Sequence, residues 1–209
     1  MVTKCRLARS SPDERREHII AVAAEAFTQE GYGATSMSTI AARVGGSKAT
    51  LYKYFPSKEA LFGAVMEERC ARVLAPLRDL RGSDSDNLEE LMADFGVRFL
   101  TKIYEQGALD VQRMIYSDGS RFPELAAVFF RSGPDVVMVE LADMLGRFRE
   151  SGVIECEDLS LAAGQFLGML RGDSHLRFTM GVEAAPPAEE IERQARMAAR
   201  IFVRGLLKR

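Results

Sequence analysis

The chain has 209 residues, of which 47% are apolar, so it is long enough to bury a substantial core and is not wholly disordered. Its formal net charge of −2 excludes a strongly basic protein, and its three cysteines exclude a dense disulfide framework. Because it has only two histidines and no closely spaced cysteine pair, we expect no metal site and no cofactor.

The charge is distributed unevenly along the chain. Residues 1–58 hold nine lysines and arginines against five acidic residues, a net charge of +4, and the remainder holds nineteen against twenty-five, a net charge of −6. A basic head on an acidic body suits a protein that presents one end to a polyanion. The N-terminus lacks the apolar segment of a signal peptide, and the longest apolar run is too short to span a membrane. We therefore expect a cytoplasmic protein with no membrane partner.

The first elements are a flexible basic arm over residues 1–11 and a helix that begins at Pro12. Proline is favoured in the first turn of a helix, and the acidic residues that follow it suit the positive end of the helix dipole. Ile19, Ala23 and Phe27 give this helix a buried stripe. We expect it to end at Gly31.

Residues 35–55 are typical of two short helices joined by a tight turn. Ser36 or Ser38 can cap the first helix, which ends at the glycine pair 45–46, and Ser47 can cap the second. Leu51 and Phe55 are four residues apart, so they can pack together onto the first helix. Pro56 disfavours any continuation beyond Phe55.

The rest of the second helix faces outward and suits DNA. A helix fits the major groove, where lysines can neutralise phosphates and hydroxyl groups can bond to backbone oxygens. Ala49 is small enough to allow close approach to the bases. An ordinary helical hairpin with solvated lysines is the alternative. The predicted DNA-binding residues are Thr35, Ser36, Ser38, Ser47, Lys48, Ala49, Thr50, Tyr52, Lys53, Tyr54 and Lys58.

Residues 15–62 resemble the DNA-binding domain of the TetR/AcrR family of bacterial transcriptional regulators. The shared residues are Ile19-Ile20, Ala23, Ala26-Phe27, Gly31-Tyr32, Thr35, Ile40-Ala41, Val44-Gly45, Ser47-Lys48, Leu51-Tyr52, Tyr54-Phe55 and Ser57-Lys58-Glu59. The resemblance implies that the second helix enters the major groove and that Lys58 grips a phosphate. It also implies a dimer on a DNA operator and a small effector. Position 46 is usually apolar in the family, so Gly46 is expected to loosen the turn and tune affinity.

The remaining sequence predicts helices only. No segment shows sustained period-two alternation, and helical spacing recurs up to the C-terminus. The predicted fold is all-α, with a three-helix helix-turn-helix domain at 12–58 and a helical effector-binding and dimerisation domain at 59–209. The helices expected in that second domain are 57–77, 88–103, 109–116, 123–132, 136–148, 159–180 and one that follows Pro187.

The last two helices predict a homodimer. The helix from Leu159 is apolar on nearly every side up to Leu170, and such a helix must be covered all round. With the last helix it would form half of a four-helix bundle that a twofold partner completes. The alternative is that both helices belong to a monomer's core. The predicted interface residues are Leu161, Gln165, Ile191, Ala195, Ala198, Phe202 and Leu206.

The second domain is rich in methionine and phenylalanine, and methionine adapts to irregular pockets. Most such residues belong to a core in any helical protein, and Arg171 with Asp173 could equally form a structural ion pair. The predicted effector-binding residues are Phe62, Met66, Phe95, Phe99, Arg113, Met114, Phe166, Met169, Arg171 and Asp173.

The sequence therefore predicts a dimeric transcriptional regulator, a repressor that a small, largely apolar effector releases from a double-stranded DNA operator. One alternative keeps DNA binding and makes the second domain a dimerisation or protein-partner module without a small ligand. A third reading is an enzyme, for which Asp173 and His175 are the only candidate pair. Since no recognisable arrangement of nucleophile and base accompanies them, we expect no enzymatic activity.

Overall fold

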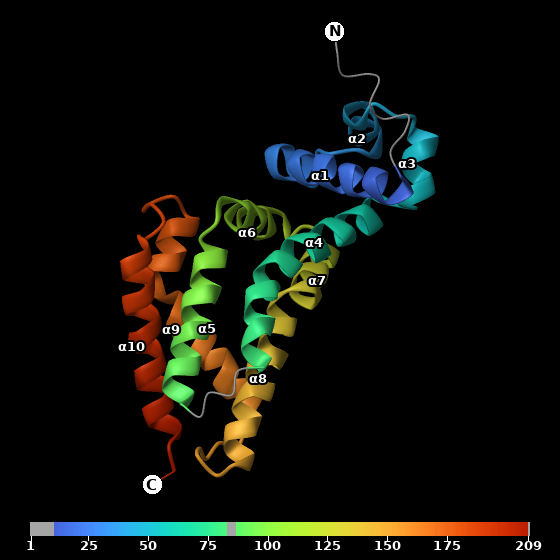
Figure 1. Ribbon diagram of the computed structural model, residues 1–209. Helices are drawn as coiled ribbons and strands as arrows, with labels where there is room; N and C mark the ends of the chain where they lie inside the picture. Colours follow the sequence, from blue (N-terminus) through green and yellow to red (C-terminus); the bar gives the residue numbers. More distant parts are fainter. Residues whose placement is uncertain (1–10, 83–86, 209) are drawn as a thin grey trace. The chain divides into compact units, whose positions relative to one another are not determined.

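The computed structural model describes residues 11–82 and 87–208, and the regular elements in these ranges are helices (Figure 1). The predicted all-α fold is confirmed. The predicted arm at 1–11 lies, apart from Ser11, outside the described residues. Within the described ranges, no helix combines the length and the apolar composition that crossing a membrane requires.

The described chain packs as two compact units, each with its own hydrophobic core. The first unit comprises residues 11–69 and 110–130, and the second comprises the described residues of 70–109 and 131–208. Packing thus groups a segment from the middle of the chain with the N-terminal helices. The functional boundary after residue 58 remains a prediction.

The first unit contains α1 (Pro12–Glu30), α2 (Met37–Val44), α3 (Lys48–Tyr54) and the start of α4 (Lys58–Arg78). A capping box fixes the start of α1: the Ser11 amide donates to Glu14 Oε2 at 2.8 Å, and the Glu14 amide donates to Ser11 Oγ at 3.1 Å. α1 ends at Gly31, whose φ of 80° favours glycine.

Most of α6 (Gln106–Asp118) and of α7 (Pro123–Ser132) completes the first unit. The core holds an aromatic cluster in which the rings of Phe27, Tyr32 and Phe62 lie 5.3 to 5.6 Å apart between centroids. Phe122, just before α7, places its ring 5.4 Å from that of Tyr32. The contacts of Phe62 with Phe27 and Tyr32 and of Phe122 with Tyr32 are edge to face, a geometry that adds to the stability gained by burying the rings.

The second unit contains η2 (Asp79–Gly82), α5 (Leu88–Ile103), α8 (Pro134–Glu150), α9 (Leu159–Thr179) and α10 (Ala188–Leu206). α5, α9 and α10 lie side by side (Figure 1). They approach closely at Gly96 of α5, where an added Cβ would lie 2.8 Å from Leu170 and 3.0 Å from Ala195. Small residues at this crossing therefore let three helices share one core.

α9 is not the continuous helix that the sequence predicts. Gly172 has φ 54° and ψ −162°, a conformation that is essentially restricted to glycine, and it divides the helix into residues 159–171 and 173–179. Near this break, the carbonyl of Leu170 accepts a hydrogen bond of 2.6 Å from Gln194 Nε2 on α10. A side chain of the neighbouring helix thus supports the backbone beside the kink.

Candidate nucleic-acid interface

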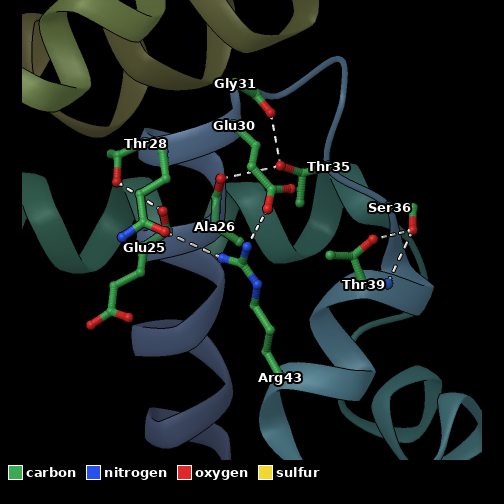
Figure 2. Close-up of polar contacts among 10 residues, drawn as sticks. Glu25, Ala26, Thr28, Glu30, Gly31, Thr35, Ser36, Thr39 and Arg43 are labelled. Carbon is green, nitrogen blue, oxygen red and sulfur yellow. Dashed lines mark hydrogen bonds and ion pairs between the residues drawn. The ribbon is translucent and has the colours of Figure 1, made fainter.

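The two helices of the predicted DNA-reading hairpin begin with the same polar device. Ser36 Oγ accepts from the amide of Thr39 at 3.0 Å, and the two hydroxyl groups lie 2.9 Å apart (Figure 2). Ser47 and Thr50 repeat this arrangement at 3.1 and 2.9 Å. Between the helices Gly45 ends α2 in the left-handed conformation, at φ 74°. These caps fix both ends of the turn.

The two faces of α3 differ as the sequence predicts. Leu51 and, at the C-cap, Phe55 are buried, with exposed fractions of 2% and 3%. The outward side carries Lys48, Ala49, Tyr52 and Lys53, all exposed, while Thr50 and Tyr54 are partly covered. The ammonium group of Lys48 lies 5.9 Å from the centre of the Tyr52 ring, within the range of a cation–π contact. Ser36, Ser38 and Ser47 are exposed as well.

Thr35 and Lys58 have structural contacts that the sequence did not predict. Thr35 is 1% exposed, and its hydroxyl donates to the carbonyls of Gly31 at 2.8 Å and Ala26 at 3.2 Å (Figure 2). Its hydroxyl is directed inward, which corrects its assignment to the DNA-binding set. Lys58 Nζ donates to the carbonyls of Tyr32 at 2.9 Å and Thr35 at 3.0 Å. Lys58 therefore holds the loop between α1 and α2.

Two consecutive arginines of α1 reach the two ends of α3. A Cβ on Gly46, in the turn before α3, would lie 3.4 Å from Nη2 of Arg15. The guanidinium of Arg16 lies 5.3 Å from the centre of the Phe55 ring at the other end. Arg15 thus lies beside position 46, where the resemblance led us to expect an apolar side chain. Neither arginine was among the predicted site residues, because no local pattern links them to α3.

A surface ion pair ties α1 to α2. The Arg43 guanidinium pairs with the Glu30 carboxylate (Figure 2). It also donates to Gln29 Oε1 at 3.5 Å. Partly exposed pairs of this kind contribute little to stability. The contact does, however, place a carboxylate against the one arginine of α2, which lowers the positive potential there.

The end of α6 contacts the loop that follows α1. The Tyr32 amide donates to Asp118 Oδ2 at 2.9 Å, and the Tyr32 hydroxyl donates to Glu59 Oε1 at 3.1 Å. Burial, together with the Glu59 carboxylate, raises the pKa of Tyr32, so the phenol stays protonated. A Cβ on Gly33 would lie 3.2 Å from the Phe122 ring. Asp118 is 86 positions from Tyr32, and a sequence pattern carries no signal for such a pair.

The predicted effector residues do not share one core. Phe62, Met66 and Met114 are buried in the core of the first unit. Four others pack in or against the core of the second unit: Phe95, Phe99, Phe166 and Met169. The apolar members are thus packed as core residues of two different clusters, and their role in binding an effector remains a prediction.

The charged members of the effector set have specific positions. Asp173 pairs with Arg177, four residues further along α9. The Arg171 guanidinium lies 5.7 Å from the centre of the Phe99 ring, and Arg113 is exposed on α6. A surface hollow of about 560 Å³ between α5 and α10 is lined mainly by glutamates and arginines, which does not match a largely apolar ligand.

The predicted dimer residues fall into two groups. Leu161 is 59% exposed and Gln165 is exposed, so both can meet a partner, and Leu206 is partly covered. The stripe on the last helix, Ile191, Ala195, Ala198 and Phe202, is 0% to 7% exposed. These four residues belong to the core that α10 shares with α5 and α9, which corrects their assignment to the dimer interface. The large apolar residues that α10 leaves exposed are Met197 and Ile201.

Two family models match this chain, one over its N-terminal helices and one over most of the remaining residues. Residues 19–65 match the family model described as bacterial regulatory proteins of the tetR family. Residues 90–205 match the model described as the C-terminal domain of AefR-like transcriptional repressors.

Individual relatives are regulators as well. The chain is 27% identical over 194 residues to the HTH-type transcriptional regulator UidR of Escherichia coli, covering 92% of both chains. It is 37% identical over 81 residues to the HTH-type transcriptional activator FasR of Mycolicibacterium smegmatis, which is 39% of this chain and 37% of that one. Among solved structures, the flavonoid-responsive regulator FrrA is 34% identical with a TM-score of 0.82, covering 94% of this chain and 99% of its own.

Proposed function

The chain belongs to the TetR family of bacterial transcriptional regulators, and we propose that it is a homodimeric repressor that a small, largely apolar effector releases from its operator. As a member of that family it is a DNA-binding regulator. The homodimer, the sign of regulation, the effector and a place in the cytoplasm are the parts that we propose.

The arrangement of α3 carries the proposal. Its inward residues anchor it on the first unit, and its outward residues supply ammonium and hydroxyl groups along one exposed side. Those groups suit phosphate oxygens and base edges of the major groove. Lys48 at the first position of the helix and Lys53 in its last turn are the cations that we expect to contact phosphates.

Dimerisation is supported by the exposed apolar residues of α9 and α10. Leu161, Met197 and Ile201 are 59%, 46% and 55% exposed, and Gln165 of α9 is exposed as well. A twofold partner that presents the same residues would cover them. Two α3 helices would then meet two half-sites of one operator.

Two similarities support repression by an effector-sensitive protein. The match over residues 90–205 is to the C-terminal domain of AefR-like repressors, and FrrA is described as flavonoid-responsive. A ligand can release the protein from DNA only if it binds more tightly to the conformation that does not fit the operator. The relative FasR is an activator, so the sign of regulation has to be measured.

The test has three steps. Genomic fragments bound by the full chain are selected and sequenced, the operator is placed before a reporter, and compounds are screened for release of the protein from the operator duplex. We expect a palindromic operator, lower reporter output with the protein present, and release by at least one neutral apolar compound. Higher reporter output would contradict repression.

The proposed alternative is a regulator whose helical body binds no small ligand and serves dimerisation or a protein partner. The burial of Phe95 and Phe166, at 1% and 0%, within a packed core favours it. Operator binding that no compound in a broad neutral and charged screen weakens would decide for this alternative.

A further inference from the structure

A buried polar pair lies in the second unit, where the end of α5 meets the part of α9 beyond its kink. Tyr104, the C-cap of α5, and His175 are each 6% exposed, and their ring centroids lie 5.8 Å apart. Among the described residues, neither Tyr104 Oη nor His175 Nε2 has a hydrogen-bond partner of ordinary geometry, although the Ser174 hydroxyl lies close enough to Tyr104 to affect its pKa. Buried polar atoms are nearly always paired, so two neighbouring exceptions require an explanation.

The surroundings of this pair are aromatic on one side and polar on the other. The Phe178 ring lies 5.0 Å from that of Tyr104, edge to face. On the other side Ser174 accepts from Gln194 Nε2, although the distance of 3.4 Å is long. The break in α9 at Gly172 lies three residues before His175. The backbone conformation at this break is accessible to glycine and not to other residues.

The electrostatics of the pair disfavour a charged occupant. Burial and the nearby charge of Arg171 lower the pKa of His175 to about 4, so its imidazole is neutral at physiological pH. Burial and the Glu183 carboxylate raise the pKa of Tyr104, while the Ser174 hydroxyl partly opposes the rise. A cation would be repelled by Arg171, and an anion would be repelled by Glu183 and would lose its hydration among the rings.

We propose that Tyr104 Oη and His175 Nε2 form the polar contact of the effector site and that they receive the hydroxyl group of a neutral phenol. A ligand hydroxyl can donate one hydrogen bond and accept another. A tyrosine hydroxyl can also do both, and a neutral imidazole has one donor nitrogen and one acceptor nitrogen. One ligand hydroxyl can therefore bond to both Tyr104 Oη and His175 Nε2. The aromatic body of the ligand would pack against Phe178. This inference rests on the proposed effector function and names the chemistry of its ligand.

The test uses three probes that differ in one group: 4-propylphenol, propylbenzene and 4-propylbenzoate. Their binding to the full chain is measured by thermal shift and by calorimetric titration, in the native sequence and in Tyr104→Phe, His175→Phe and Tyr116→Phe. Tyr116 is 61% exposed, so Tyr116→Phe is the matched control. We expect 4-propylphenol to bind best, with affinity lost about tenfold in each of the first two variants and unchanged in the control, since each loses one hydrogen bond to the ligand.

The unliganded variants provide a second readout. Because each substitution removes a buried polar atom that lacks a hydrogen bond of ordinary geometry, Tyr104→Phe and His175→Phe should melt no lower than the native chain. A fall of several degrees in Tyr104→Phe would show that its hydroxyl has a structural partner and would overturn the proposal. If His175→Phe does not fold, Tyr104→Phe alone decides.

Failure of the subsite is distinct from failure of the effector function. Equal binding of 4-propylphenol and propylbenzene, stronger binding of 4-propylbenzoate, or no binding of the three probes overturns the subsite. A compound that releases operator DNA equally from the native chain and from both variants also overturns it, and leaves the effector function intact. Absence of release by any compound in the broad screen overturns both.

Discussion

Lys48 and Lys58, two lysines of the first unit, lie in different surroundings. Lys48 is exposed at the start of α3 with its ammonium near the Tyr52 ring. Lys58 donates to the carbonyls of Tyr32 and Thr35. A charged donor to backbone carbonyls stabilises the fold, whereas an exposed cation remains available for phosphate.

Lys58→Ala should lower the free energy of unfolding by about 2 kcal/mol, because a hydrogen bond to a charged group contributes roughly 1.5–3 kcal/mol. Lys48→Ala should leave stability within about 0.5 kcal/mol of the native value and weaken binding to all duplexes alike. Urea unfolding and fluorescence anisotropy with a labelled duplex measure the two effects. A fully stable Lys58→Ala chain would contradict the structural role.

His175 makes stability depend on pH in a defined direction. Its pKa is lowered to about 4 in the folded chain, while in the unfolded chain it is near 6.5. Between these values the unfolded chain binds a proton that the folded chain does not, so stability is complete above pH 6.5 and falls as the pH drops toward 4.

Thermal melts at pH 7.5 and pH 5 measure this dependence. The native chain should lose more stability on acidification than His175→Phe, which has no group to protonate there. An identical loss in the two chains would show that His175 is not buried in its neutral form.

At the scale of elements, the turn between α2 and α3 contains two glycines with different conformations. Gly45 has φ 74° and ends α2, whereas the φ of Gly46 lies outside the left-handed region. An added Cβ on Gly46 meets only the end of the flexible Arg15 side chain, at 3.4 Å. The first glycine is therefore required by backbone geometry and the second is not.

Gly45→Ala should destabilise the chain by about 1 kcal/mol, because the left-handed conformation is costly for a residue with a Cβ. Gly46→Ala should stabilise it by about 0.4–1 kcal/mol, because it restricts the unfolded chain at no steric cost. Chemical denaturation of the two variants side by side makes each the control of the other. Destabilisation by both would show that Arg15 cannot move aside.

Sequence patterns predicted the helices of the N-terminal unit well, because their ends are fixed locally by caps such as Ser47 and by Gly45. They failed where distant segments meet. The apolar stripe of α10 is compatible with a dimer interface and with the core of a single chain, and the contact of Ala195 with Gly96 of α5 places it in the core. The kink at Gly172 and the contact from Asp118 to Tyr32 likewise depend on tertiary packing, which periodicity does not encode.

At the scale of the whole molecule, the proposed dimer would depend on residues that a single chain leaves exposed. Ile201→Glu places a charge at a position that is 55% exposed and that we expect a partner to bury. Light scattering should then report a species near 23.2 kDa, against twice that mass for the native chain. Phe130→Glu, at a 50% exposed position of α7, is the control and should remain dimeric. A dimeric Ile201→Glu would place the interface elsewhere.

The bond between Asp118 and Tyr32 has a consequence for exchanging parts between related regulators. A chimera that joins residues 1–65 to a foreign body would lose the carboxylate that holds the Tyr32 amide and the Phe122 ring that covers Gly33. The loop that follows α1 would then need an equivalent carboxylate and an equivalent ring from the foreign body. Recombination that preserves this unit therefore has to carry residues 110–130 together with the N-terminal helices.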